Sequence, residues 1–391
     1  MTNTLADPAA DAARLAAELR QDAAERDLAA GTPKAQRDRI RSSGLLKLMI
    51  PIEFGGFGGT WPEMLHSVRE IATADGSLAH LYAYHHLSMV TPHLVGTDAQ
   101  RERWYSLTAR NNLFWGNSLN PLDPRTTLAP AGDGSFRLDG EKSFCTGARD
   151  SDLLLVSARE PGQTQLRVAV LPTSREGITI HDDWDNMGQR QTDSGSVSYR
   201  DVLVNPDEFL GPPGIGGSIW AGLRPCVTQS ILSNIFAGIA RGAFDEARTY
   251  TRTLDRPFAG SSAARPSEDP YIIERYGEMQ VQLRAAECLL DVAGEALQCA
   301  WQRLQDLTPA ERGECAVAVA TAKVAAGRCA LDVTSKMFEV MGARATSARY
   351  RFDRFWRNAR TLTLHDPLDY KVREVGDWVL NERFPAPSFY S

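Results

Sequence analysis

Apolar side chains recur at helical spacing through residues 9–110. One stripe contains Trp61, Met64, Leu65, Val68, Ile71 and Ala72, and the next contains Leu78, Leu81, Tyr82, His85 and Met89. Intervals of three and four residues place such side chains on one face of a helix. A glycine-rich turn, Gly55–Gly59, stands before the first stripe. The first third of the chain is therefore predicted to be helical.

The pattern changes after Asn112. Short runs with β-type composition follow one another, each broken by Gly, Pro, Asn or Asp: SFRLDG, DLLLVS, LRVAVLP, GITI and SVSYRDVLV. Strands of this length with no helices between them are typical of an antiparallel sandwich or barrel. The β-rich block is expected to end near Pro213.

Long helical stretches return beyond the glycines at 214–217. They cover about 218–256, 270–304, 309–341 and 367–382. Long helices joined by short loops favour an antiparallel bundle. Three domains are predicted: an N-terminal helical domain at 1–111, a central β domain at 112–213 and a C-terminal helical bundle at 214–391.

Pairs of a capping residue and proline mark several predicted helix starts. Asp7, Thr32, Asp269, Thr308 and Asp366 each precede a proline. An Asp or Thr side chain accepts hydrogen bonds from the first free N–H groups of a helix, and proline fits the first helical position. Thr60 and Thr308 also stand three residues before a glutamate, the spacing of a capping box.

Charge and composition narrow the class of protein. The chain of 391 residues is 43% hydrophobic, its net charge is −6, and it has six cysteines without a C-x-x-C spacing. An acidic balance argues against nucleic acid as a partner. No apolar run is long enough to span a bilayer, so no membrane association is expected. We expect a cytoplasmic protein with reduced thiols.

Several familiar motifs are missing. Neither Gly55–Gly59 nor Gly211–Gly217 has the G-x-G-x-x-G spacing of a dinucleotide site, and G-x-S-x-G is absent. His80, His85, His86 and His93 have no metal-site spacing, so no metal is predicted. From the residues alone, His85 fits a core histidine or a catalytic one, and His365 fits a surface residue or a catalytic one. Four arginines fit phosphate ligands or a solvated surface: Arg252, Arg256, Arg344 and Arg357.

Longer stretches carry a family resemblance. GEKSFCTGARDSD, MGQRQTDSGSVSYRDVLVNPDEFLG and FWRNAR resemble segments of the acyl-CoA dehydrogenase fold. REIATADGSLAHLYAYHH, YTRTLDRPF, SEDPYIIERYGE and RFDRFWRNARTLTLHDP resemble one subgroup, the flavin-dependent monooxygenases typified by dibenzothiophene monooxygenase. The resemblance covers nearly the whole chain. It implies a mainly helical fold in which a central β-barrel or sandwich separates N-terminal helices from a C-terminal four-helix bundle.

The resemblance also implies an activity. Such enzymes are homotetramers that use dioxygen and reduced FMN, which a separate NAD(P)H:flavin reductase supplies; FAD is the alternative cofactor. A peroxide formed at flavin C4a then oxygenates an apolar aromatic substrate, which is a dibenzothiophene-like thioether or an indole-like heterocycle. Two other classes stay open, a true acyl-CoA dehydrogenase and a non-catalytic scaffold of the same fold.

Site residues follow from the resemblance as well. It assigns catalytic roles to His85, His365, Thr146 and Asn120. It places Phe144, Thr146, Trp184 and Asn117 at the flavin ring, and Arg256 and Arg344 at the flavin phosphate, with the two arginines contributed by different subunits. The substrate is expected to contact Tyr84, Met89, Phe114 and Phe258.

One departure from the dehydrogenases bears on the reaction. Many of them carry a Glu-Gly pair after the arginine-containing motif, and the glutamate removes a proton beside a thioester. Here the stretch reads His365-Asp366-Pro367. Asp366 is expected to cap the last helix, which leaves His365 as the proton donor for oxygen chemistry at neutral pH.

Overall fold

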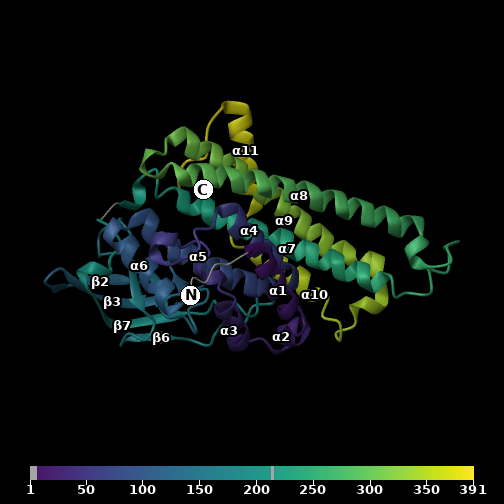
Figure 1. The fold of residues 1–391 in the computed structure, drawn as a ribbon, viewed down its shortest axis with the longest axis horizontal. Helices are drawn as coiled ribbons and strands as arrows, with labels where there is room; N and C mark the ends of the chain where they lie inside the picture. Colours follow the sequence, from purple (N-terminus) through teal and green to yellow (C-terminus); the bar gives the residue numbers. More distant parts are fainter. Residues whose placement is uncertain (1–6, 213–214) are drawn as a thin grey trace.

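The computed structural model describes residues 7–212 and 215–391. Six helices form its N-terminal part, as the apolar stripes predict (Figure 1). They are α1 (Pro8–Arg20), α2 (Ala23–Ala29), α3 (Lys34–Ser42), α4 (Trp61–Ala74), α5 (Gly76–Val95) and α6 (Asp98–Asn111), with 3-10 turns η1 (Leu45–Lys47) and η2 (Ile52–Phe54) before α4.

Helix α5 is the central element of this part. Every residue of it except His93 is buried. It packs against α4, α6 and the first β-strand, and also against two helices of the C-terminal half, α7 and α10. A helix buried on all sides can present polar side chains only to internal partners or to a cavity. Its four histidines therefore have defined internal environments.

Two sheets form the central part. The strands are β1 (Trp115–Ser118), β2 (Thr127–Gly132), β3 (Ser135–Lys142), β4 (Leu153–Ala158), β5 (Arg167–Pro172), β6 (Ile178–Ile180) and β7 (Val197–Val204). One sheet has the order β1-β4-β5 and the other the order β2-β3-β7-β6. The second sheet is antiparallel throughout, as expected. The first is mixed, because β1 pairs with β4 in parallel, which corrects the all-antiparallel prediction.

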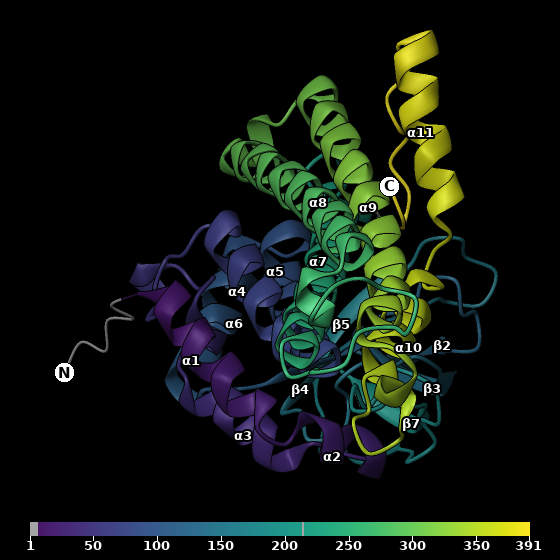
Figure 2. The ribbon, with the colours of Figure 1, turned by 90° about the vertical axis from the view of Figure 1, so that its right-hand side faces the viewer.

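The C-terminal part is built on three long helices that run side by side (Figures 1 and 2). They are α7 (Leu223–Thr251), α8 (Pro270–Gln302) and α9 (Pro309–Met341), with short 3-10 turns η3 (Pro206–Glu208), η4 (Ile215–Gly217), η5 (Pro266–Glu268), η6 (Leu304–Asp306) and η7 (Ala343–Thr346) between elements. Helix α10 (Asp353–Thr363) packs on α7 and α9, and α11 (Leu368–Asn381) packs on α9. The sequence prediction missed α10 as a separate helix. Figure 2 shows α11 standing away from the rest of the molecule.

Most predicted helix starts are confirmed. Asp7 and Asp269 accept backbone hydrogen bonds at α1 and α8, and Thr60 and Thr308 form complete capping boxes at α4 and α9. Thr32 is a correction, because α3 begins after Pro33 without a side-chain cap and the Thr32 hydroxyl donates to Asp193 instead.

Asp366 is the second correction. Helix α11 has Pro367 at its N-cap position and no side-chain cap. Both carboxylate oxygens of Asp366 instead lie 2.6 Å from Nζ of Lys323, a buried side chain on α9. Lys323 also donates to Gln229 of α7. Burial lowers the pKa of Lys323 to about 8. Burial alone would raise the pKa of Asp366, but the hydrogen bond from His365 and the charge of Lys323 lower it to about 2. The pair ties the α10–α11 junction to the bundle.

His85 is the core histidine that the residues alone left open, and not the catalytic one that the family resemblance implied. Its Nε2 lies 2.9 Å from the carbonyl oxygen of Leu46, and its Nδ1 accepts the backbone N–H of Trp115 at 3.2 Å. Both ring nitrogens are thus used by a neutral imidazole that joins α5 to η1 and β1. Burial lowers the pKa of His85 to about 4.

Replacing His85 should therefore affect stability first. His85→Ala removes two buried hydrogen bonds and opens a void, so we expect the free energy of unfolding to fall by about 2–5 kcal/mol in urea titrations. The folded-state pKa lies below the ordinary 6.5, so the stabilisation is present above pH 6.5 and is lost as the pH falls towards 4. When the pH is lowered from 7.5 to 5.0, the free energy of unfolding of the native protein should fall by about 2 kcal/mol more than that of His85→Gln. Equal pH slopes for the two proteins would contradict this role.

The Lys323–Asp366 pair makes a second prediction. Asp366→Ala leaves a buried ammonium group without its counter-charge, so the free energy of unfolding should fall by roughly 3–5 kcal/mol. Loss of an ordinary N-cap would cost only about 0.5–2 kcal/mol. The combined Lys323→Met, Asp366→Leu variant should regain most of the loss, and Asp369→Ala in the exposed first turn of α11 is the matched control. A double variant as unstable as Asp366→Ala would count against the pair.

Candidate active site

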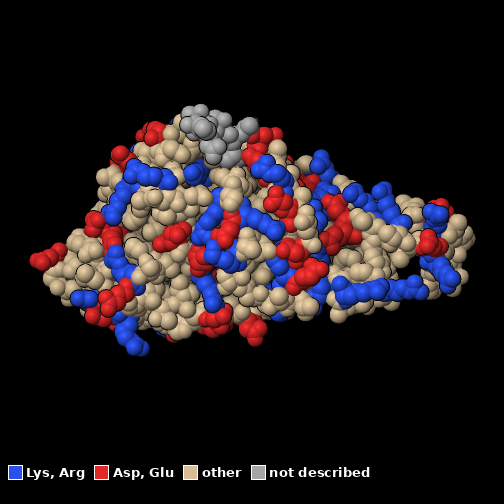
Figure 3. Space-filling view, turned by 60° about the horizontal axis from the view of Figure 1, so that its bottom comes forward, with Lys and Arg blue, Asp and Glu red and all other residues tan. Residues whose placement is uncertain are grey.

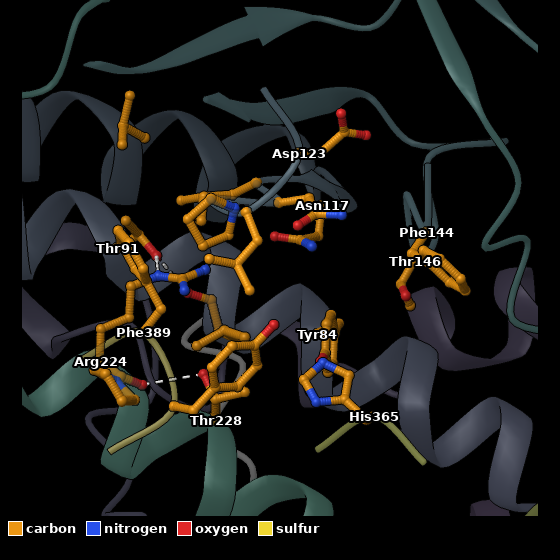
Figure 4. Close-up of a pocket in the computed structure, with 18 of the residues that line it drawn as sticks. Tyr84, Thr91, Asn117, Asp123, Phe144, Thr146, Arg224, Thr228, His365 and Phe389 are labelled. Carbon is orange, nitrogen blue, oxygen red and sulfur yellow. Dashed lines mark hydrogen bonds between the residues drawn. The ribbon is translucent and has the colours of Figure 1, made fainter. Parts of the chain in front are cut away.

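A large cavity lies where the three parts of the chain meet. Its volume is about 1580 Å³, and it is bounded by α5, the start of α7, loops of both sheets, the end of α10 and the C-terminal segment (Figure 4). Much of its wall is apolar, including Leu87, Leu119 and Leu210. A deep, mainly apolar cavity with a few convergent polar groups is the usual form of a cofactor and substrate site.

Many of the predicted site residues line this cavity. These are Tyr84, Asn117, Asn120, Phe144, Thr146, Trp184 and His365. They come from α5, from β1 and the loop after it, from the loops after β3 and β6, and from the α10–α11 junction. Figure 4 shows Phe144 and Thr146 on one side, with Tyr84 and His365 below Asn117. The fold thus brings residues that are far apart in the sequence together around one cavity.

The loop after β3 offers aromatic and hydroxyl groups together. Phe144 has a positive φ of 59°, is 63% exposed, and meets Trp184 edge-on with ring centroids 6.0 Å apart. The Thr146 hydroxyl lies 2.9 Å from that of Ser194, and the backbone N–H of Asn117 donates to the Thr146 carbonyl. The left-handed backbone at Phe144 turns its ring outwards into the cavity mouth. Two aromatic rings set nearly at right angles thus stand beside hydrogen-bonding groups.

Three buried polar atoms of the cavity wall have no partner among the described residues: Oδ1 of Asn117, Nε2 of His80 and Oγ1 of Thr361. Buried polar atoms are nearly always hydrogen-bonded in folded proteins. An acceptor oxygen and a ring nitrogen beside an aromatic wall fit the N–H, N and O edge of a flavin ring. The residues present therefore fit a flavin.

The sequence reasoning missed His80. Its Nδ1 lies 3.2 Å from Oε1 of Gln189, whose amide Nε2 donates to the carbonyl oxygen of Asn358 on α10. Gln189 therefore accepts from Nδ1, which leaves Nε2 of His80 unprotonated. Burial lowers the pKa of His80 to about 3, so the ring is neutral near pH 7. His80 stands four residues before Tyr84, and the two rings touch with centroids 4.4 Å apart. An interval of four residues, about one helical turn, places His80 on the same helix face as Tyr84, and this spacing could have indicated His80 as a site residue from the sequence.

His85, by contrast, lies behind the wall. It is fully buried and does not line the cavity, because five residues along a helix turn it away from the face that carries His80. Its assignment to the cavity is corrected by the contacts with Leu46 and Trp115.

His365 lies at the cavity with its side chain 35% exposed. Its Nδ1 is 3.0 Å from Oδ1 of Asp366. Since Lys323 keeps Asp366 ionised, Nδ1 carries the proton and donates to the carboxylate. This contact orients the ring as a carboxylate orients a catalytic histidine, and it leaves Nε2 free for chemistry.

Other predicted residues lie elsewhere. Met89 and Phe114 are fully buried in the core, and Phe258 is 84% exposed in the loop after α7. Arg256 and Arg344 are exposed at the far end of the bundle, in the loop after α7 and in η7. None of the five lines the cavity of the described chain. The spacing of these five residues along the sequence could not show that each lies outside the cavity.

No cluster of three or more His, Cys, Asp or Glu side chains suited to a metal ion occurs within residues 7–212 and 215–391. None of the helices in those ranges is long and apolar enough to cross a membrane. Positive and negative side chains interleave over the face in Figure 3.

Comparison with known families covers most of the chain. Three descriptions match in order: the acyl-CoA dehydrogenase N-terminal domain at 8–112, the middle domain at 116–202 and the C-terminal domain at 230–370.

Full-length relatives are more specific. The "Probable FMNH2-dependent monooxygenase SfnC" of Pseudomonas putida is 49% identical over 100% of this chain and 99% of its own. The methanesulfinate monooxygenase MsuC of Pseudomonas fluorescens has 48% identity and a TM-score of 0.96 over 99% of this chain and 100% of its own. The dibenzothiophene monooxygenase TdsC of Paenibacillus sp. A11-2 has 44% identity and a TM-score of 0.93 over 98% and 100%. Structures of TdsC bound to FMN and to indole are known. With these likenesses along its full length, the chain belongs to the acyl-CoA dehydrogenase family and is a flavin-dependent monooxygenase of that fold.

Proposed function

We propose that this chain uses FMN, reduced by a separate NAD(P)H:flavin reductase, and dioxygen to oxygenate a small electron-rich substrate. Bound reduced flavin would supply activated oxygen and two electrons. The observation that carries the proposal is the wall formed by Phe144, Trp184, Thr146 and Asn117, with the unpartnered oxygen of Asn117 ready for a ring N–H. Relatives named for FMNH2 and solved with FMN support the choice of FMN over FAD.

The carboxylate arrangement speaks against dehydrogenation. A dehydrogenase base must be a carboxylate free to take a proton from the substrate. Asp366 is engaged by Lys323 on both oxygens and by His365, and its pKa is lowered to about 2, so it is a poor base near pH 7. Asp366 does not itself line the cavity, and the carboxylates that do are Asp123, which binds Arg125, and the exposed Asp185.

We assign two different tasks to the histidines of the wall. His365, aimed by Asp366, would hold or donate a proton through Nε2 when the second oxygen atom leaves. His80 is kept neutral by burial, so its Nε2 would accept a hydrogen bond from the cofactor or the substrate. Leu87, Leu119 and Leu210 would keep bulk water away, which limits the loss of oxygen as hydrogen peroxide.

Substrates follow from the relatives. Dibenzothiophene-like thioethers and indole-like heterocycles fit the apolar walls, and TdsC is known with indole bound. The name of MsuC adds methanesulfinate as a second candidate.

The test supplies FMN reduced by light, so that no reductase is needed. Mixing the full chain with this flavin, air and each candidate substrate should give oxygenated product. An acyl-CoA dehydrogenase would instead bleach bound flavin on anaerobic addition of an acyl-CoA. Flavin oxidation at the rate of free solution, without product from any candidate, would overturn the proposal.

The histidines provide the third prediction. His365→Ala should lower the product formed per flavin oxidised by about 10²–10⁴-fold, the range for a lost proton-transfer group, with a matching rise in hydrogen peroxide. His80→Ala should weaken FMN binding as well, because Nε2 faces the proposed ring site. His181→Ala, an exposed histidine outside the cavity, is the matched control. Unchanged coupling in both cavity variants would remove the two histidines from the mechanism.

Arg256 and Arg344 fit the proposal only in an oligomer. They lie far from the cavity of their own chain, so we propose that they reach the FMN phosphate from a neighbouring subunit of a cytoplasmic homotetramer. Exposed apolar side chains on the outer helices support such contacts: Tyr271, Ile273, Val281 and Val292 on α8, and Tyr370, Val379 and Leu380 on α11. Helix faces of this kind commonly pack between subunits.

This assembly makes the fourth prediction. Light scattering should give four times the mass of one chain, and Arg256→Ala should weaken FMN binding by about 1.5–3 kcal/mol, the scale of a hydrogen bond to a charged group. Arg265→Ala, a nearby exposed arginine, should bind FMN normally. A monomer with full FMN affinity would contradict both the assembly and the phosphate site.

A further inference from the structure

Arg224 brings a positive charge to a largely apolar part of the cavity. It is the second residue of α7 and lines the cavity together with Thr91 and Thr228 (Figure 4). Its Nε donates to the Thr91 hydroxyl at 3.0 Å, and the Thr228 hydroxyl donates to its carbonyl oxygen at 3.1 Å. Thr91 in turn donates to the Leu87 carbonyl. The guanidinium is therefore held in place by α5.

The charge of Arg224 has no counter-charge in the described chain. It forms no ion pair with a carboxylate of residues 7–212 or 215–391, and its two terminal nitrogens donate to none of those residues. The cavity carboxylates Asp123 and Asp185 form no ion pair with it either. Burial lowers the pKa of Arg224 to about 10, which still leaves it protonated near pH 7. The Arg224 side chain is only half-buried, and a half-buried cation without a counter-charge in a largely apolar wall is stabilised when an anion binds beside it.

The position of Arg224 in the first turn of α7 adds to the excess of positive charge. The first turn of a helix is the positive end of its dipole, where anions are stabilised and cations are not. Helix α7 is 29 residues long and its N-cap, Gly222, supplies no side-chain oxygen. Gly222 and Pro225 also line the cavity, so this helix end faces the same space as the guanidinium. Two independent sources of positive potential thus meet at one place.

We propose that the Arg224 guanidinium, held in place by Thr91, is an anion-binding subsite for the substrate, and that the substrate is a small organosulfur oxyanion of the alkanesulfinate class. This inference rests on the proposed monooxygenase function and narrows its substrate. A carboxylate would match the charge but offers no atom to oxygenate. The sulfur of a sulfonate has no lone pair. A sulfinate provides both, because two oxygens share the negative charge and the sulfur keeps a lone pair.

The reaction balances with the reactants already named. The sulfur lone pair forms a new S–O bond to one atom of dioxygen, the O–O bond breaks, and the other atom leaves as water. The overall change is R–SO2⁻ + O2 + FMNH2 → R–SO3⁻ + FMN + H2O. Sulfur and reduced FMN each give two electrons, and in the overall balance FMNH2 supplies the two protons of the water, one of them by way of His365. Arg224 would bind a sulfinate oxygen through its planar pair of N–H donors.

Direct binding tests the subsite without any turnover. Calorimetry on the full chain, with and without oxidised FMN, would compare methanesulfinate with dimethyl sulfoxide, in which a neutral methyl group replaces one charged oxygen. The native protein should bind methanesulfinate at least about tenfold more tightly, the usual effect of a hydrogen bond between charged groups. Arg224→Leu should abolish this preference and Arg224→Lys should keep part of it. Arg248→Leu, near the other end of α7, should keep all of it.

The outcomes separate this inference from the proposed function. Equal binding of the two probes by the native protein, or full methanesulfinate binding by a folded Arg224→Leu, would overturn the subsite. If Arg224→Leu does not fold, as judged by its thermal melting, Arg224→Lys decides, because loss of the planar fork should remove part of the preference for methanesulfinate and leave the binding of dimethyl sulfoxide unchanged, whereas an unchanged preference would overturn the subsite. Arginine-dependent binding without FMNH2-driven formation of methanesulfonate would support the subsite and contradict the proposed function. Oxygenation of indole or dibenzothiophene by a protein that does not bind methanesulfinate would support the proposed function and contradict the subsite.

Discussion

A buried ion pair between α9 and the α10–α11 junction is the interaction on which the site depends. Lys323 is 1% exposed and can be accommodated there only because Asp366 and Gln229 surround its ammonium group. Asp366 at the same time accepts from His365, so one carboxylate both neutralises a buried charge and aims the ring at the cavity. The bundle thereby positions the His365 ring, to which we assign proton transfer, and Asp366, at the position where a dehydrogenase would need its base, is a structural anion.

The fold was largely predictable because local physical rules agreed with the tertiary structure. Capping pairs at Asp7, Asp269 and Thr308 marked true helix starts, and the change from helical to strand spacing after Asn112 marked the β-rich part. Asp366 has the same local pattern, but a buried lysine 43 residues earlier in the chain competes for its carboxylate. The parallel pairing of β1 with β4 was also beyond local reasoning, because pairing partners depend on non-local contacts.

The site was predictable where a motif and a helical face agreed. Phe144, Thr146 and Trp184, which the family resemblance assigns to the flavin ring, line the cavity. The histidine of α5 was misplaced because that helix is buried on all sides, so the apolar stripe could not distinguish the cavity face of His80 from the core face of His85. Arg224 gave no signal, since an arginine at a helix start is usually solvated. The role proposed for Arg224 depends on the absence of a counter-charge among the described residues, which is visible only in the three-dimensional structure.

Oxygen transfer is the central claim, and isotope labelling tests it most directly. The full chain would be mixed with chemically reduced FMN and ¹⁸O₂ in ordinary water, with methanesulfinate, dibenzothiophene and indole as separate substrates, and the products analysed by mass spectrometry. The account predicts one ¹⁸O atom in each molecule of oxygenated product. Product that contains only oxygen from water, or consumption of all the ¹⁸O₂ as hydrogen peroxide without labelled product, would contradict it.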